Sequence, residues 1–289
     1  MLDEAKNNFD AVRLGLALTV VVFHIFALTN LSFLQGLALF NADFAVKGFF
    51  AISGFLVTKS YLSSSSVGEF FEKRARRIYP AYFGVILICL FLGIIFTDLD
   101  SQSFLRHPDT MKYVLSNLTF LNFIQSSLPE VFNSNPLKHM DGSLWTIKVE
   151  ICLYACVPLI VSSFRRWGGL ITIVVVVLAS FAWVVIFSSV FANGFGPEIA
   201  RQFPGQLSYF TLGALFATNL KASNRIVMIL ISSALLFLIF KGSVLRLLIE
   251  PFLYASLVIY LATKAFKKIQ VGEVGVYRGG AWVCLGGAL

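Results

Sequence analysis

One apolar run near the start of the chain, residues 12–31, contains two ionisable side chains, Arg13 and His24. The two residues lie eleven positions apart, almost three turns of an α-helix, so they share one face about 16 Å apart along the axis. Ionisable groups at membrane depth usually face a protein interior or a water-filled cavity and mark a working site. The spacing therefore predicts that this face of the helix belongs to a functional site. The alternative is a histidine with a structural role only, whose ring nitrogens form hydrogen bonds with a neighbouring helix.

A carboxylate lies inside another apolar run, which opens Ser143-Leu144-Trp145 and contains Glu150. In a helix Glu150 would lie about 10 Å inward from Ser143 and on the same face. An unpaired carboxylate at that depth is costly, so Glu150 should accept hydrogen bonds, with Arg13 or His24 as the expected donors.

The run at residues 44–62 is preceded by Asp43 and contains Lys47, four positions later, which is the favourable order for a helical ion pair. Gly48 and Gly54, with Ser53 beside them, would let another helix approach closely. By themselves these signals favour helix packing over chemistry.

Arg74 and Arg77 lie three positions apart, on one face of the helix expected to enter the third apolar run. Paired guanidinium groups suit bidentate capture of phosphate. A basic connection that only anchors the chain at the cytoplasmic face is the alternative interpretation.

These residues must be positioned by membrane helices, because the composition excludes a soluble domain. Apolar residues make up 57% of the 289 and charged residues 13%, against about 45–50% and 25% in soluble domains. The formal charge of +8 could suggest nucleic acid, but the basic residues lie between apolar runs, so no nucleic-acid partner is expected. The four cysteines lack zinc-ligand spacing, so no metal is expected.

Eight apolar runs are candidate membrane spans, and they predict an all-α, polytopic transmembrane helical bundle. Basic residues cluster in the connections after the second, fourth, sixth and eighth runs, which places the N-terminus in the cytoplasm. The runs are 12–31, 44–62, 78–97, 143–163, 169–191, 205–220, 226–240 and 247–263.

Two segments do not fit the pattern of short connections. Residues 98–142 are expected to form one long external loop, either a lid or binding element or a solvated connector. Residues 272–289 are rich in glycine and contain no run able to span, so we expect a membrane domain over 1–271 followed by a tail or an altered end.

Four motifs occur in a fixed order: Arg13 with His24, the run Phe49–Leu56, the run Phe71–Pro80, and Ser143-Leu144-Trp145 followed by Glu150. With this order the chain resembles the acyltransferase-3 family, integral membrane enzymes that O-acylate surface polysaccharides, lipid-linked glycans and related acceptors. The resemblance covers residues 9 to about 160, and the second half carries only hydropathy. The family usually has about ten spans.

The resemblance implies a bacterial inner-membrane O-acyltransferase of the O-antigen or exopolysaccharide type. Acyl-CoA, expected to be acetyl-CoA, would bind from the cytoplasm, and a glycan hydroxyl would arrive from outside. His24 would act as general base or carry the acyl group briefly, with Glu150 orienting it and Arg13 stabilising developing charge. The implied sites are His24, Arg13 and Glu150 for catalysis, Arg74 and Arg77 for the coenzyme A phosphates, and Trp145, Ser143 and Asp43 for substrate.

Intramembrane His, Glu and Arg also serve as proton relays and gates, so a multi-span transporter is the main rival. Transporters often contain internal repeats, and the sequence has no second copy of the Arg13–His24 spacing. A scaffolding subunit whose charged stripes only pack helices is a weaker rival. Oligomeric state, acceptor sugar and acyl chain are left open.

Overall fold

The computed structural model describes residues 8–29, 41–133, 139–140, 142–192, 194–219 and 223–263, and this part of the chain contains helices and no strand. These residues form two compact units, the first from the described residues of 8–67 and 149–263 and the second from those of 68–148. The glycine-rich segment 272–289 lies outside the described residues.

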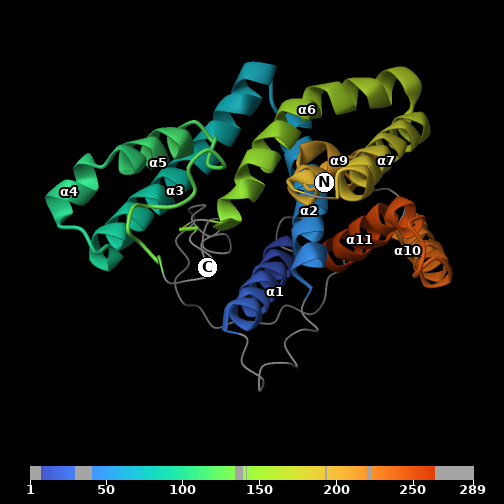
Figure 1. Ribbon diagram of the computed structural model, residues 1–289. Helices are drawn as coiled ribbons and strands as arrows, with labels where there is room; N and C mark the ends of the chain where they lie inside the picture. Colours follow the sequence, from blue (N-terminus) through green and yellow to red (C-terminus); the bar gives the residue numbers. More distant parts are fainter. Residues whose placement is uncertain are drawn as a thin grey trace, which may run out of the picture. The chain divides into compact units, whose positions relative to one another are not determined.

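Each of the eight apolar runs is a helix, which confirms the all-α class (Figure 1). Five helical stretches in the described residues are long and apolar enough to cross a membrane by themselves: those at α1, α3, α6, α7 and α11. The count of eight spans and the cytoplasmic N-terminus stay predictions. The eight helices are α1 (Phe9–Thr29), α2 (Ala42–Leu62), α3 (Val67–Phe96), α6 (Trp145–Trp167), α7 (Gly169–Val185), α9 (Phe203–Asn219), α10 (Ser223–Ile239) and α11 (Arg246–Thr263).

In the first unit α2 packs against α1, α9 and α11, and glycines set its distance from α9. A Cβ at Gly54 would lie 2.0 Å from the carbonyl oxygen of Phe210, and one at Gly213 would lie 1.9 Å from that of Ala51. The two backbones therefore touch from both sides, as small residues allow in membrane bundles. The packing role predicted for Gly54 is confirmed.

The buried face of α1 is the face that carries Arg13 and His24. Leu16 and Val20 belong to the core of the unit, and a Cβ at Gly48 of α2 would meet Leu16 at 3.2 Å. At about 100° per residue, Val20 points within about 20° of Arg13 and about 40° of His24. The exposed apolar residues of α1, Leu14, Leu18 and Ile25, lie on another face.

In the second unit, the segment expected to be a long external loop folds against α3. It contains α4 (Ser101–Arg106) and α5 (Pro108–Leu118), which lie beside each other (Figure 1). Phe104 and Tyr113 are fully buried in one hydrophobic cluster with Tyr82 and Ile86 of α3. Its described part, up to residue 133, is therefore neither a loose lid nor a solvated connector.

α5 buries polar side chains and exposes apolar ones. Asn117 is fully buried and donates to the Tyr113 carbonyl, whereas Met111 and Leu115 are more than half exposed. An apolar stripe on the outside favours contact with lipid, which is the environment expected for residues 111–125.

Short elements complete the described chain. A 3-10 turn, η3 (Gly142–Leu144), leads into α6, and a π-helical turn, η4 (Ile186–Val190), continues α7. The short helix α8 (Gly196–Ala200) then precedes α9. These elements matter because η4, α8 and the start of α9 border the larger cavity described next.

Candidate functional site

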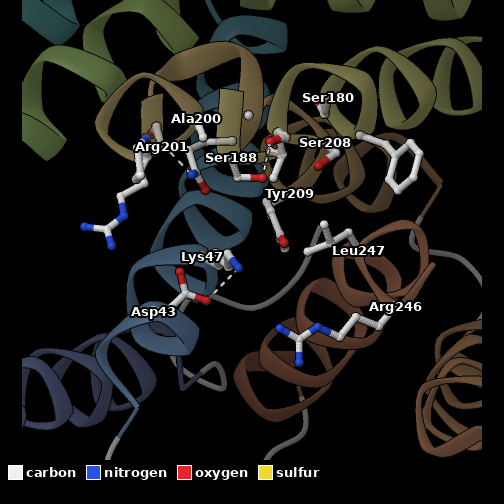
Figure 2. A pocket seen from close by; sticks show the side chains of 15 residues that line it. Asp43, Lys47, Ser180, Ser188, Ala200, Arg201, Ser208, Tyr209, Arg246 and Leu247 are labelled. Atoms are coloured by element: carbon white, nitrogen blue, oxygen red, sulfur yellow. Dashed lines mark hydrogen bonds and ion pairs between the residues drawn. The ribbon is translucent and has the colours of Figure 1, made fainter. Parts of the chain in front are cut away.

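A cavity of about 400 Å³ lies in the first unit, bordered by α2, α7, α8, α9 and α11 (Figure 2). Its volume falls within the range of about 300–1,000 Å³ that is usual for ligand pockets. Asp43, which was predicted to contact substrate, lines this cavity. The other lining residues are Lys47, Ser180, Phe181, Val184, Ser188, Pro197, Ala200, Arg201, Gly205, Gln206, Ser208, Tyr209, Arg246 and Leu247.

Lys47 is the most deeply placed cation of the cavity. Its amine lies 2.6 Å from Asp43, as the four-residue spacing predicted, and 2.9 Å from Glu250 of α11. Lys47 and Glu250 are 12% and 7% exposed, whereas Asp43 is 59% exposed. The ring of Tyr209 faces the same amine with its centroid at 5.4 Å. A buried charge is tolerated because it is paired in this way.

Replacing Lys47 with methionine should lower stability by about 2 kcal/mol, because Glu250 would lose its buried counterion. This is less than the 3–5 kcal/mol of a fully buried pair, since the cavity can admit water. The measurement is the thermal unfolding midpoint of the purified protein. Adding Glu250→Gln to Lys47→Met should restore part of the loss, and a double variant at least as unstable as the sum of the single ones would contradict the pairing.

Glu150 is held by two hydroxyl groups. Ser53 of α2 donates to its Oε1 at 2.7 Å, and Tyr154, one turn further along α6, donates to the same oxygen. The sequence had predicted Arg13 or His24 as donors, so the partners differ from those expected. Hydroxyls on adjacent helices can supply the hydrogen bonds without a second charge. Lys148 instead lies over the ring of Phe123.

Arg13 and His24 are both half-buried on the inner face of α1. The Nδ1 atom of His24 lies 2.8 Å from the Val20 carbonyl oxygen, so it acts as the donor, and Nε2 is the nitrogen left to accept a proton. Neither residue lines the 400 Å³ cavity, and Glu150 does not line it either.

The remaining predicted site residues belong to the second unit. Arg74 is half-buried and Arg77 is exposed on the first part of α3. Their neighbours Lys73 and Arg76 form ion pairs of 2.6 Å with Glu69 and Glu72 on the same helix. Ser143 and Trp145, at the start of α6, are half-buried.

A second cavity, of about 320 Å³, lies at the other end of α2 from Asp43. It is bordered by the C-terminal turns of α2, α6 and α9 and by the start of α7, and Arg165 is its charged residue. Its lining residues are Leu62, Val161, Phe164, Arg165, Gly169 and Thr218.

An acyltransferase family model matches residues 6–276, which is almost the whole chain. The chain belongs to the acyltransferase-3 family. No solved structure matches it.

Three relatives of this acyltransferase-3 chain illustrate the family. Nodulation protein 10 of Rhizobium leguminosarum bv. viciae is 30% identical over 73% of this chain and 59% of its own length. An O-acetyl transferase of Shigella phage Sf6 is 32% identical over 59% of this chain and 50% of its own. The O-acetyltransferase OatA of Staphylococcus aureus is 23% identical over 73% and 34%. The chain thus spans about half of the length of these relatives.

The sequence analysis predicted the pairing of Lys47 with Asp43 but missed Glu250, the second carboxylate beside Lys47. Glu250 lies inside an apolar run, as Glu150 does, and the argument applied to Glu150 would have selected it. Gln206, Arg201 and Arg246 gave no such signal, because polar residues near the ends of apolar runs are common.

Proposed function

We propose that this acyltransferase-3 protein is a membrane-bound O-acyltransferase that moves an acyl group, acetyl in the first instance, from acyl-CoA to a glycan hydroxyl. The observation that carries the proposal is the family match over residues 6–276, together with relatives named as O-acetyl transferases. Because the chain spans only part of those relatives, the activity of the whole protein is itself part of the proposal.

The chemistry we assign centres on α1. His24 takes the proton of the acceptor hydroxyl through Nε2, while the Val20 carbonyl holds Nδ1–H and so fixes the tautomer. The freed oxygen attacks the thioester carbonyl, and the carbon–sulfur bond breaks. The leaving thiolate takes the proton back from His24, so coenzyme A is released as the thiol. Arg13, on the same face, stabilises the developing negative charge. The hydroxyl-bound Glu150 orients the acceptor or the imidazole.

We place the protein in the bacterial inner membrane with its N-terminus in the cytoplasm. α2 then begins at the outer face, so the cavity beside Asp43 opens toward the acceptor. Arg74 and Arg77 come next after α2 along the chain, on the cytoplasmic side where coenzyme A is available. The basic connections of the sequence support this orientation.

The direct test incubates the full-length protein, purified in nanodiscs, with labelled acetyl-CoA and surface glycan from a strain that lacks the gene. Label should appear on the glycan as an alkali-labile ester. Flux of a substrate across vesicles without acyl turnover would favour the transporter instead. Comparing the glycan esters of cells with and without the gene identifies the acceptor.

The double variant Arg74→Ala, Arg77→Ala should bind coenzyme A about tenfold more weakly, because phosphate groups would lose two charge-assisted contacts. The matched control is Lys73→Ala, Arg76→Ala, which removes the same charge from the same turns but breaks only ion pairs with Glu69 and Glu72. Titration with coenzyme A measures both. Equal affinities in the two double variants would show that only the charge of the loop matters and would contradict the assigned donor site.

A further inference from the structure

The 400 Å³ cavity is lined by a buried polar side chain, Gln206, whose hydrogen-bonding capacity the described residues do not fully satisfy. Gln206 is 5% exposed, and its amide nitrogen donates to the Arg201 carbonyl at 3.2 Å, but its Oε1 atom is buried without a hydrogen-bond partner. Tyr209 is 4% exposed, and its side chain borders the same cavity (Figure 2). Buried polar groups usually have partners, so such atoms lining a cavity point to a ligand with hydroxyl or amide groups.

The charge of the cavity selects the kind of ligand. Lys47, Arg201 and Arg246 line it together with one carboxylate, Asp43. Among the described residues Lys47 is already paired, whereas Arg201 and Arg246 are exposed and have no ion pair. Guanidinium groups without an ion pair on the cavity lining favour an anionic group that accepts in bidentate geometry.

The walls also carry surfaces suited to a sugar ring. Tyr209 contributes an aromatic side chain to the wall, and Ser188 and Ser208 contribute side chains with hydroxyl groups (Figure 2). A ligand pocket typically combines such apolar walls with a few polar groups that fix orientation.

We propose that this cavity binds a saccharide unit that carries a carboxylate or phosphate group. Arg201 and Arg246 hold the anionic group, and Gln206, Tyr209 and Asp43 hold the hydroxyl or amide groups of the ring. The proposal rests on the proposed function and narrows it, since it makes the acceptor an acidic glycan.

Binding can be measured without acyl transfer, so the two proposals fail separately. The full-length protein in nanodiscs is titrated calorimetrically with methyl glucuronide, glucose 1-phosphate and the neutral methyl glucoside. At least one acidic probe should bind about tenfold more tightly than the neutral one. The better acidic probe tells whether a carboxylate or a phosphate is preferred. If the protein transfers acyl groups to a neutral glycan and binds acidic and neutral probes equally, this inference is wrong and the proposed function is still supported.

The variants Arg201→Gln and Arg246→Gln should each reduce the preference for the acidic probe, and together abolish it. Arg165→Gln, which removes a guanidinium at the other cavity, should leave it unchanged. Gln206→Met should weaken all three probes alike, because it removes a hydrogen-bond acceptor and no charge.

Three results would overturn the assignment. One is equal binding of acidic and neutral sugars, and another is a preference that survives in the double arginine variant. The third is competition between coenzyme A and methyl glucuronide that depends on Arg201 and Arg246, which would make the cavity a donor site.

Discussion

Replacing His24 with alanine should lower the rate of acyl transfer by about 10²–10⁴-fold, the usual contribution of a general base. The imidazole lies on the inner face of α1 beside Val20, whose carbonyl oxygen receives the Nδ1 proton. Nε2 is then free to take the proton of an acceptor hydroxyl, and alanine offers no such acceptor. The measurement is incorporation of label from acetyl-CoA into glycan at saturating donor, so that the effect appears in kcat.

A matched control is available at His107, which has a structural role in the other unit. Its Nδ1 atom accepts from the Asp109 backbone at the start of α5, and His107→Asn would keep an acceptor there. This variant should retain transfer close to that of the unaltered protein. Full activity in His24→Ala would remove the imidazole from the mechanism, and coenzyme A affinity unchanged in that variant would show that only chemistry was lost.

Gly54→Ala should destabilise the first unit by about 3 kcal/mol or more, because the added methyl would lie against the backbone of α9 and not against a flexible side chain. The Phe210 carbonyl oxygen would be 2.0 Å away, so α2 and α9 would have to separate. A loss of this size lowers the unfolding midpoint by about 6–12 °C in a chain of this length. Thermal unfolding in a mild detergent measures it.

Gly15→Ala is the control for this substitution. Gly15 is also a helical glycine of the first unit, but a Cβ there would meet nothing within 4 Å. Alanine favours helix over glycine by about 1 kcal/mol, so the variant should be as stable as the unaltered protein or slightly more stable. Similar midpoints for the Gly15 and Gly54 variants would contradict the close approach of α2 and α9.

The eight longest helices were predictable because each coincides with a predominantly apolar run. The ion pair between Asp43 and Lys47 and the packing role of Gly54 were also predictable, because both depend on residue types and spacing within one helix. Contacts between helices were not predictable in this way. Hydropathy does not tell which helix lies next to Glu150. In the structure this helix is α2, whose Ser53 donates a hydrogen bond to the carboxylate.

The segment after α3 shows a second limit. Its length left a lid or binding element and a solvated connector as alternatives, yet Phe104 and Tyr113 are fully buried. The apolar residues are too few and too scattered to indicate a core, because α5 points them in two directions, Tyr113 inward and Met111 outward. A helix with both buried and exposed apolar residues has no clear apolar face, so its sequence pattern does not show that it packs against α3.

The contact between Lys47 and Glu250 joins residues 203 positions apart, in the second apolar run and in the last helix of the described chain. During synthesis the lysine enters the bilayer long before its acidic partner has been made. Until then the amine has only Asp43 beside it, a mostly solvated carboxylate. Arrival of α11 is therefore the step that gives the Lys47 amine its buried partner, and it couples maturation of the cavity wall to synthesis of the last described helix.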